Sequence, residues 1–558
     1  MQLGRKFPRS SGVLMAIPAL HGPFGIGVMG TEAMEFIDTL HECGFHAWQV
    51  LPIEQASMWC GSPYNCLSAF AGEPMFIDPR NLHEMGLVTD EELHERMEGM
   101  SDETIDYELV RNKQQTLLRA AFSRQSDDAY KEFNPFWLDE YSLFIAIKKH
   151  NNYEAWYQWQ DAGLRSHDKN TLKDYRQKLS EEIEFFRFVQ WLFDKEWKKL
   201  RSYAAEKGIS IIGDMPIYLS DDSAEVWSRR ELFNADSDGK FSAIGGVPPD
   251  YFSPDGQRWG NPIYNWKLMK KENYSWWVSR LKAALERYDV VRIDHFRGFE
   301  SYWHIPGDSV TAKKGKWVKG PGIELIKALE KSLGDLSLSV IAEDLGIIDN
   351  NVVKLLKDSG FRCMRVLQFG FGGDGVHLPH NIPEDSTAYT GTHDNTTFLG
   401  WLFDISDEER KEALFYTGFD GDWTIGGPNC PVMKSWIHTL FMTRASLTII
   451  PIQDMLGYGA DTRTNTPGTD SGNWRFRIRY GVLDTIDKEF YSNLHKTFQR
   501  DDPLKAFKPK KKKKKPSAED FLYYSNPEEF KNADEYEQEY ELQGEPENES
   551  DDVEVTQI

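Results

Sequence analysis

Cysteine is scarce in this chain. Among 558 residues there are five cysteines, namely Cys43, Cys60, Cys66, Cys363 and Cys430. A small and odd number of cysteines is typical of free thiols in a reducing compartment and argues against a disulfide framework. The expected location is therefore the cytoplasm.

Long apolar runs are missing as well. Hydrophobic residues make up 40% of the chain, yet no run approaches the roughly 18 apolar residues that a membrane-spanning helix needs. The apolar stretch near the N-terminus is short and contains Pro18, so we interpret it as part of the mature protein. These features exclude a membrane protein.

Positive charge is in deficit. The chain has 65 Lys and Arg against 88 Asp and Glu, for a formal net charge of -23, which disfavours binding to nucleic acid. Residues 517–558 carry -14 of this charge, and residues 1–516 carry the remaining -9. Composition changes near Asp501, where the lysine run Lys510–Lys515 precedes an acidic stretch with few aliphatic residues. We expect residues 501–558 to form a disordered tail, because they cannot bury enough apolar surface to offset the entropy of ordering.

The first 500 residues alternate short apolar runs with helical patterns. This alternation predicts strands and helices around a parallel sheet. Eight such runs lie near residues 12, 47, 209, 289, 338, 364, 387 and 446, and eight strands close a (β/α)8 TIM barrel. We therefore predict an α/β protein with a catalytic barrel over residues 1–500, a mainly helical subdomain inserted at 56–200, and an active-site loop at 245–266.

Polar side chains cluster where the predicted strands end. In barrels of this kind the reacting groups lie at the C-terminal ends of the strands. One such carboxylate is equally well explained as a helix N-cap, whereas four polar strand ends favour a catalytic site over a structural ion-pair network on the rim. The residues concerned are Asp214 on the third strand, Arg292 and Asp294 on the fourth, Glu343 on the fifth, and His393 and Asp394 on the seventh.

Two of these carboxylates suit glycoside chemistry. A retaining mechanism needs a nucleophile and an acid/base about 5–5.5 Å apart, and neighbouring strand ends can supply that separation. We predict Asp294 as the nucleophile and Glu343 as the acid and then the base. Arg292, on the same side of its strand as Asp294, is expected to lower the pKa of Asp294 and keep it ionised.

Several longer strings identify a family. VVRIDHFRGFE at 290–300, IAEDLG at 341–346 and TGTHDNTT at 390–397 occur with SPYNCLSAFAGEPMFID at 62–78, GGVPPDYFSPDGQRWGNPIYNW at 245–266 and PGTDSGNWRFR at 467–477. With these strings in this order, the chain resembles the 4-alpha-glucanotransferases, also called amylomaltases or disproportionating enzymes, which are related to the alpha-amylase barrel enzymes. The resemblance covers roughly residues 10–500.

The resemblance implies a double displacement on maltooligosaccharides and other alpha-1,4-glucans, with no cofactor. It implies that Asp294 carries the covalent glucosyl intermediate, that Glu343 exchanges protons, and that Asp394 binds sugar hydroxyls and favours the distorted ring. Transfer rather than hydrolysis also rests on the resemblance, and the sequence gives no oligomeric state. The residues it implies for substrate binding are Tyr64, Asp214, Gln257, Trp259, Arg292 and His393.

Competing signals support other functions. Gly25, Gly27 and Gly30 imitate a dinucleotide fingerprint, which makes an NAD-dependent oxidoreductase a rival, although the fingerprint's tight turn is absent. An inactive glycan-binding protein is a further alternative, but all three carboxylates are present. The His41, Cys43 and His46 cluster is interpreted as structural rather than zinc-binding. A calcium loop at 234–245 is rejected because Gly245 stands where a bidentate Glu is needed, so no metal is predicted.

Overall fold

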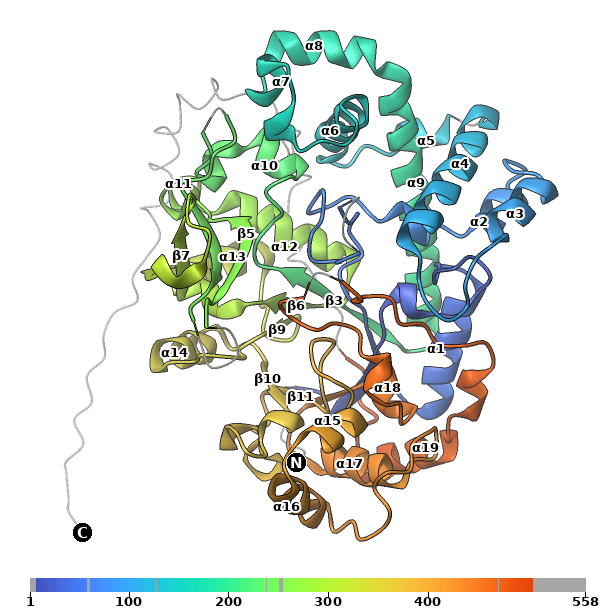
Figure 1. The fold of residues 1–558 in the computed structure, drawn as a ribbon, viewed down its shortest axis with the longest axis vertical. Helices are drawn as coiled ribbons and strands as arrows, with labels where there is room; N and C mark the ends of the chain where they lie inside the picture. The colour runs from blue at the N-terminus through green and yellow to red at the C-terminus, as the bar shows by residue number, and fades with distance from the viewer. Residues whose placement is uncertain are drawn as a thin grey trace, which may run out of the picture. The chain divides into compact units, whose positions relative to one another are not determined.

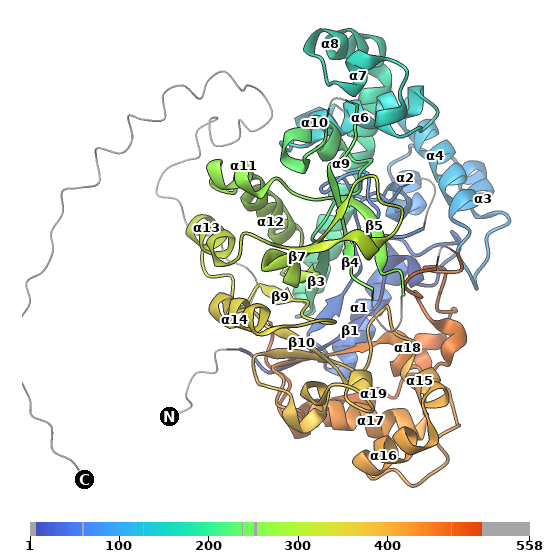
Figure 2. The same cartoon turned by 60° about the vertical axis from the view of Figure 1, so that its left-hand side comes forward.

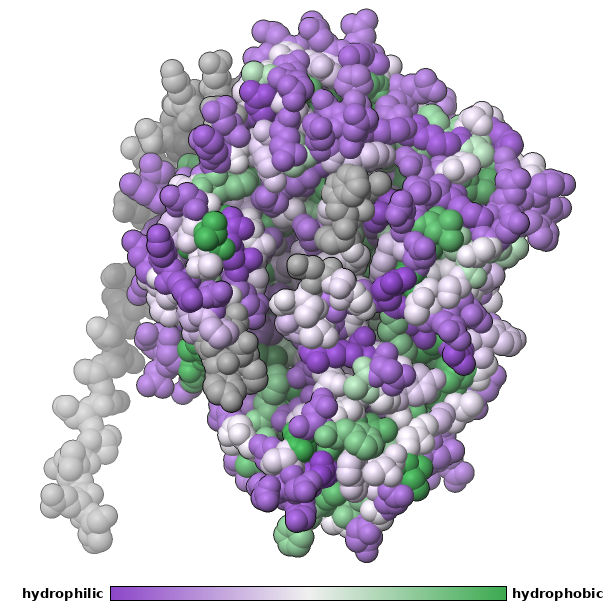
Figure 3. Space-filling view, viewed as in Figure 1, coloured by the Kyte–Doolittle hydropathy of each residue, from purple (hydrophilic) through white to green (hydrophobic). Residues whose placement is uncertain are grey.

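The computed structural model describes residues 7–57, 61–126, 128–236, 238–249, 254–469 and 471–504. The predicted tail lies outside the described residues from 505 onwards, as do Cys60 and residues 250–253 of the predicted active-site loop. Among the described residues, no helix is long and apolar enough to cross a membrane. On the face shown in Figure 3 hydrophilic residues predominate, and hydrophobic ones form small scattered groups.

Eight parallel strands form the centre of the molecule (Figure 1). Each begins within a few residues of a predicted apolar run, and the order around the sheet is β10-β11-β12-β1-β2-β3-β6-β9. The strands are β1 (Ser10–Leu14), β2 (Ala47–Gln49), β3 (Ser210–Pro216), β6 (Val290–Asp294), β9 (Val340–Ala342), β10 (Cys363–Val366), β11 (Ser386–Tyr389) and β12 (Leu447–Pro451).

The two ends of this sheet meet and close the barrel. Ile341 of β9 forms a parallel bridge with Arg362, and the Ala342 N–H donates to the Arg362 carbonyl at 2.8 Å. The barrel interior is filled by an apolar cluster from the strands, including Ile212, Val290 and Leu447. Because strands of a parallel barrel are buried on both faces, they appear in the sequence as near-continuous apolar runs. The predicted TIM-barrel class is confirmed.

Helices surround the barrel and make up most of the segment between β2 and β3 (Figure 2). Their ends follow local signals: Asp349 caps α14 through the N–H groups of Asn351 and Val352, and Gly360 ends it with φ 66°. The helices are α1 (Thr31–Cys43), α2 (Pro79–Glu84), α3 (Asp90–Met97), α4 (Tyr107–Arg124), α5 (Ala129–Glu132), α6 (Leu138–His150), α7 (Ala162–Arg165), α8 (Lys169–Lys178), α9 (Ser180–Glu206), α10 (Ala224–Ser228), α11 (Trp266–Lys271), α12 (Ser275–Arg287), α13 (Ile323–Leu333), α14 (Asn350–Ser359), α15 (Phe398–Asp404), α16 (Asp407–Thr417), α17 (Pro431–Met442), α18 (Ile452–Met455) and α19 (Lys488–Phe498).

The segment predicted as a helical insertion contains α2 to α9. The last of these, α9, has 27 residues and belongs to both the insertion and the barrel. It packs on α6 in the insertion and on α1 and β3 in the barrel, and its Trp197 Nε1–H donates to the Arg287 carbonyl at the end of α12 at 3.0 Å. The insertion therefore ends inside a continuous helix, and sequence periodicity cannot mark that boundary.

The structure places two strands where the sequence predicted a loop. β4 (Ala243–Val247) and β5 (Gln257–Pro262) pair antiparallel, and β7 (Ser301–Pro306) and β8 (Lys316–Lys319) extend them into the sheet β5-β4-β7-β8. A Cβ at Gly246 would lie 2.1 Å from the Gln257 carbonyl oxygen. The glycine that suggested a loop is therefore required where the two strands approach each other closely.

Leu504 lies in the interior of the barrel. It packs in the interior cluster with the strand residues, and Arg500 before it donates to the carbonyls of Ser10, Thr443 and Ala445 at 2.9–3.2 Å. The folded part of the chain thus extends past the predicted boundary at 501.

We predict that a chain ending at Leu504 keeps the full-length melting temperature, whereas Leu504→Ala in the same truncated chain loses about 2 kcal/mol of stability, since the substitution removes buried methyl groups and leaves a cavity. Denaturant unfolding of the two truncated chains measures this difference. Equal stabilities would show that Leu504 does not contribute to the core.

Candidate active site

Asp294 and Glu343 come from adjacent strand ends. Ile293 of β6 pairs with Ala342 of β9, so the next residue on each strand is one of the two carboxylates. The Glu343 N–H donates to the Ile293 carbonyl at 3.0 Å, which continues the pairing. Neighbouring strands lie about 4.8 Å apart. Side chains from neighbouring strand ends can therefore bring their carboxyl groups to the separation that a retaining pair requires.

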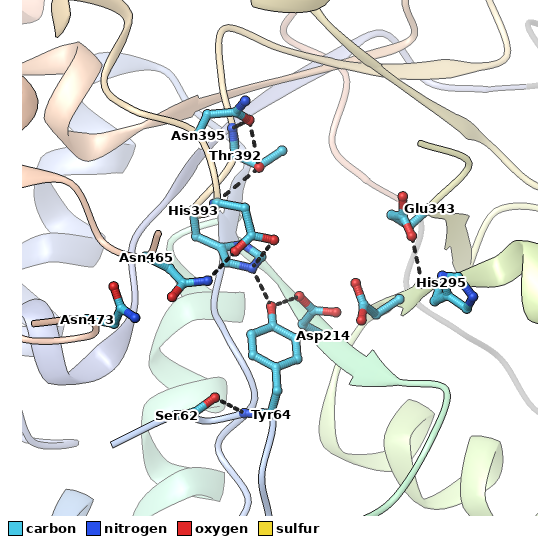
Figure 4. Close-up of polar contacts among 12 residues, drawn as sticks. Ser62, Tyr64, Asp214, His295, Glu343, Thr392, His393, Asn395, Asn465 and Asn473 are labelled. Atoms are coloured by element: carbon cyan, nitrogen blue, oxygen red, sulfur yellow. Dashed lines mark hydrogen bonds and ion pairs between the residues drawn. The ribbon is translucent and has the colours of Figure 1, made fainter. Parts of the chain in front are cut away.

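The backbone fixes the Glu343 carboxylate. Its Oε2 accepts from the His295 N–H at 2.7 Å and its Oε1 from the Leu345 N–H at 2.8 Å, and Figure 4 shows the contact with His295. His295 has φ 54°, a left-handed conformation that is uncommon outside glycine. Burial and the neighbouring Asp294 raise the pKa of Glu343 well above that of an ordinary glutamate. The side chain therefore favours its protonated form.

Arg292 links Asp294 to Asp214. Its guanidinium is buried and lies 2.9 Å from Asp294 Oδ1, while its Nη1 donates to both Asp214 oxygens at 2.6 and 2.8 Å. Burial raises the pKa of Asp294, and the lowering by Arg292 does not cancel that effect because Asp214 and Asp394 add negative charge. Arg292 thus lowers the pKa of Asp294 as predicted, but burial and the two neighbouring carboxylates outweigh its effect. Burial raises the pKa of both carboxyls, and the charge of Asp294 raises that of Glu343 further, so the pair favours a state that holds one proton, as an acid and a nucleophile together require.

Tyr64 connects Asp214 with His393. Its hydroxyl donates to Asp214 Oδ2 at 2.7 Å and lies 2.9 Å from His393 Nε2, as Figure 4 shows. The Tyr64 and His393 rings are stacked, with centroids 5.3 Å apart and planes 18° apart. Tyr64 comes from the segment after β2 and His393 from the segment after β11, so the fold brings together residues 329 positions apart.

Asp394 is held by a residue that the sequence analysis did not identify. Asn465 Nδ2 donates to Asp394 Oδ1 at 2.6 Å, and the Asn465 N–H donates to the His393 carbonyl at 3.1 Å. Arg463 Nη2 donates to the Asp394 carbonyl at 2.6 Å. Asn465 lies just before the PGTDSGNWRFR string, whose place in the family order was the available signal.

Gln257 and Trp259 lie on β5, and Trp259 contacts His295, whose N–H donates to Glu343. Trp259 Nε1–H donates to Gln257 Oε1 at 3.1 Å, and the Trp259 ring meets the His295 ring edge to face at 4.9 Å. The Trp259 side chain is 37% exposed. An exposed indole against His295 offers an apolar face to a sugar.

The competing signals do not form sites. A Cβ at Gly30 would lie 1.6 Å from Asp78 Oδ2, so the carboxylate of Asp78 occupies the place near the start of α1 where a phosphate would bind. Within the described ranges no group of three or more His, Cys, Asp and Glu could hold a metal. His41 Nδ1 lies 2.9 Å from the Lys207 carbonyl and His46 Nδ1 3.3 Å from the Gly208 carbonyl. The glycines and these histidines are structural.

The raised pKa of Glu343 predicts a pH-dependent cost in stability. A carboxyl whose pKa is higher in the folded state contributes stability below its ordinary pKa and loses it as pH rises through the folded value. Because glutamine does not titrate, Glu343→Gln should melt at a higher temperature than the wild type, with a gap that widens from pH 4 to pH 8. Thermal scans across this range test this, with the exposed Glu408→Gln as control; a gap independent of pH would contradict it.

Comparisons with known proteins identify the family of this chain. The model of the 4-alpha-glucanotransferase family matches residues 15–484. A 4-alpha-glucanotransferase of Thermus thermophilus is 40% identical over 493 residues, covering 86% of this chain and 96% of that protein. One of Streptococcus pneumoniae is 39% identical over 502 residues, covering 88% of this chain and 97% of that protein.

A solved structure extends the agreement to the fold. An amylomaltase from Streptococcus agalactiae in complex with acarbose superposes with a TM-score of 0.83 at 39% identity, covering 88% of this chain and 99% of that one. The amylomaltase of Corynebacterium glutamicum shares the fold alone, with a TM-score of 0.70 at 17% identity, over 89% of this chain and 75% of that one. With its catalytic-type carboxylates on adjacent strand ends of such a barrel, this chain belongs to the 4-alpha-glucanotransferase family.

Proposed function

We propose that this enzyme cleaves an alpha-1,4 bond in a maltooligosaccharide and passes the released segment to the 4-hydroxyl of another sugar, with retention. The observation that carries the proposal is the placement of Asp294 and Glu343 on adjacent strand ends, where burial raises the pKa of both carboxyls. The name and the acarbose ligand of the related amylomaltase support alpha-glucans as the substrate class.

The first step uses Glu343 as the acid. Its raised pKa keeps a proton available, which it gives to the glycosidic oxygen as that bond breaks. Asp294 attacks the anomeric carbon and forms a glycosyl ester. In the second step Glu343, now ionised, takes the proton of the acceptor 4-hydroxyl, whose oxygen displaces Asp294. The two inversions together retain the configuration.

The surrounding residues bind and orient the donor. Asp394, fixed by Asn465, accepts hydrogen bonds from sugar hydroxyls and favours the distorted ring. Arg292 balances the charge of Asp294 and Asp214, while Tyr64 and His393 line the same side. Gln257 and Trp259, the latter against His295, contact the sugar on the acceptor side.

The proposed reaction needs only carboxylates and a sugar acceptor. It therefore requires no cofactor or metal, and no nucleic acid or membrane partner. A cytoplasmic location, where glycogen and maltodextrins are stored and degraded, is part of the same proposal and rests on the few cysteines.

Incubation of the purified enzyme with maltotriose tests the proposal. We expect glucose and a ladder of longer maltooligosaccharides, with a constant number of reducing ends, because transfer conserves glycosidic bonds. Rising reducing ends without longer products would instead show a hydrolase on the same barrel. No change at all would favour a binding protein.

A further inference from the structure

Trp474 has a backbone conformation that is rare for a bulky residue. Its φ is 65°, in the left-handed region where a side chain other than glycine is strained. Such outliers persist only where the surroundings enforce them, and they cluster at functional sites. Trp474 lies at the candidate active site, which makes its conformation informative.

Two hydrogen bonds enforce this conformation. The Trp474 N–H donates to the Thr464 carbonyl at 2.7 Å, and the Trp474 carbonyl accepts from the Tyr107 hydroxyl at 2.7 Å. The first bond joins Trp474 to the segment that carries Asn465, the residue that holds Asp394. The second bond joins it to α4, in the helical insertion. The backbone of Trp474 is thus held from two sides.

This backbone conformation places the Trp474 indole beside the rings of Tyr64 and His393. Its centroid lies 5.7 Å from that of Tyr64 and 5.9 Å from that of His393, and these two rings stack on each other. Tyr64 and His393 in turn contact Asp214 and Asp394. The half-buried indole therefore packs beside Tyr64 and His393, the two residues that contact Asp214 and Asp394.

We propose that Trp474 is a positioning residue for the transfer reaction, holding Tyr64 and His393, and through them Asp394, in the geometry that the transition state needs. This inference rests on the proposed function. A misplacement of about 1 Å at such groups costs about 100-fold in rate. The role also gives a reason for the strained backbone, because the left-handed conformation of Trp474 accompanies the contact of its ring with Tyr64 and His393.

Trp474→Gly separates the ring from the backbone. Glycine adopts a positive φ without strain, so both backbone hydrogen bonds remain while the indole is lost. We expect kcat on maltotriose to fall about 100-fold with the melting temperature nearly unchanged, and Trp474→Phe to recover most of the rate. Tyr153→Gly is the matched control, since Tyr153 is another half-buried aromatic residue with positive φ, in the helical insertion; it should leave kcat/KM unchanged.

A double-mutant cycle with Tyr64→Phe completes the test. If Trp474 acts through Tyr64 and His393, the combined loss should be smaller than the product of the single losses. If the two single losses simply multiply in the double variant, the residues act independently and the proposal is overturned. A raised KM with an unchanged kcat would also overturn it, because that pattern marks a residue that binds substrate and transition state equally. If Trp474→Gly does not fold, Trp474→Leu is judged by the same criteria. The wild-type enzyme is assayed in parallel. If the wild type itself forms no maltooligosaccharide ladder, the proposed function fails; if only the variants depart from the expected losses, the role of Trp474 fails.

Discussion

Asp294→Asn should reduce transfer from maltotriose by on the order of 10⁵-fold or more, the size of loss seen when a covalent nucleophile is removed. The amide can still lie beside Arg292, but it cannot form the glycosyl ester. Folding should be preserved, because the ionised Asp294 carboxylate is itself disfavoured by burial, as its raised pKa shows. Chain-length analysis of the products and a thermal scan measure the two effects.

The control for this prediction is a buried carboxylate whose pKa is also raised but which lies outside the reaction. Asp454 accepts from the Thr390 hydroxyl and from the Phe398 N–H at 2.7 Å, so Asp454→Asn is expected to alter stability more than kcat. Substantial residual transfer by Asp294→Asn, at a level above contaminating wild type, would exclude Asp294 as the nucleophile.

Glu343→Gln should have the second-largest effect, a loss of about 10²–10⁴-fold with natural glucans, the usual contribution of a general acid and base. A donor whose leaving group needs no proton, such as an alpha-maltosyl fluoride, should still form the intermediate. The intermediate should then accumulate, because no base activates the acceptor. Burst kinetics of fluoride release measure this; equal losses with both donors would contradict the role of Glu343 as the acid.

Much of the barrel could be predicted from the sequence because its strands are short apolar runs. A parallel strand buried on both faces has to be apolar throughout, so β3 or β12 is visible without knowledge of its neighbours. β4 and β5 could not be predicted from the sequence, because their glycines, such as Gly246, indicate a turn unless the partner strand is known. Helix α9 also hides the end of the insertion, since its pattern is continuous.

In the site, too, features set by the local sequence could be predicted, whereas contacts between distant segments could not. Asp214 and Asp294 lie near the ends of their strands, and Glu343 and Asp394 follow theirs. Because the C-terminal ends of parallel barrel strands meet on one face, their proximity was predictable. The contact of Asn465 with Asp394 spans 71 residues and depends on how the segment after β12 folds back. The net pKa of Asp294 could not be predicted either, because burial, which is a tertiary property, outweighs the visible Arg292.

The central claim is that Asp294 carries the glycosyl group and Glu343 exchanges the proton. The most direct test treats Glu343→Gln with alpha-maltosyl fluoride, digests the protein at low pH and locates the adduct by mass spectrometry. We predict a maltosyl ester on the peptide that contains Asp294, and no adduct in the Asp294→Asn, Glu343→Gln double variant. An adduct on another residue, or one that persists without Asp294, would contradict the account.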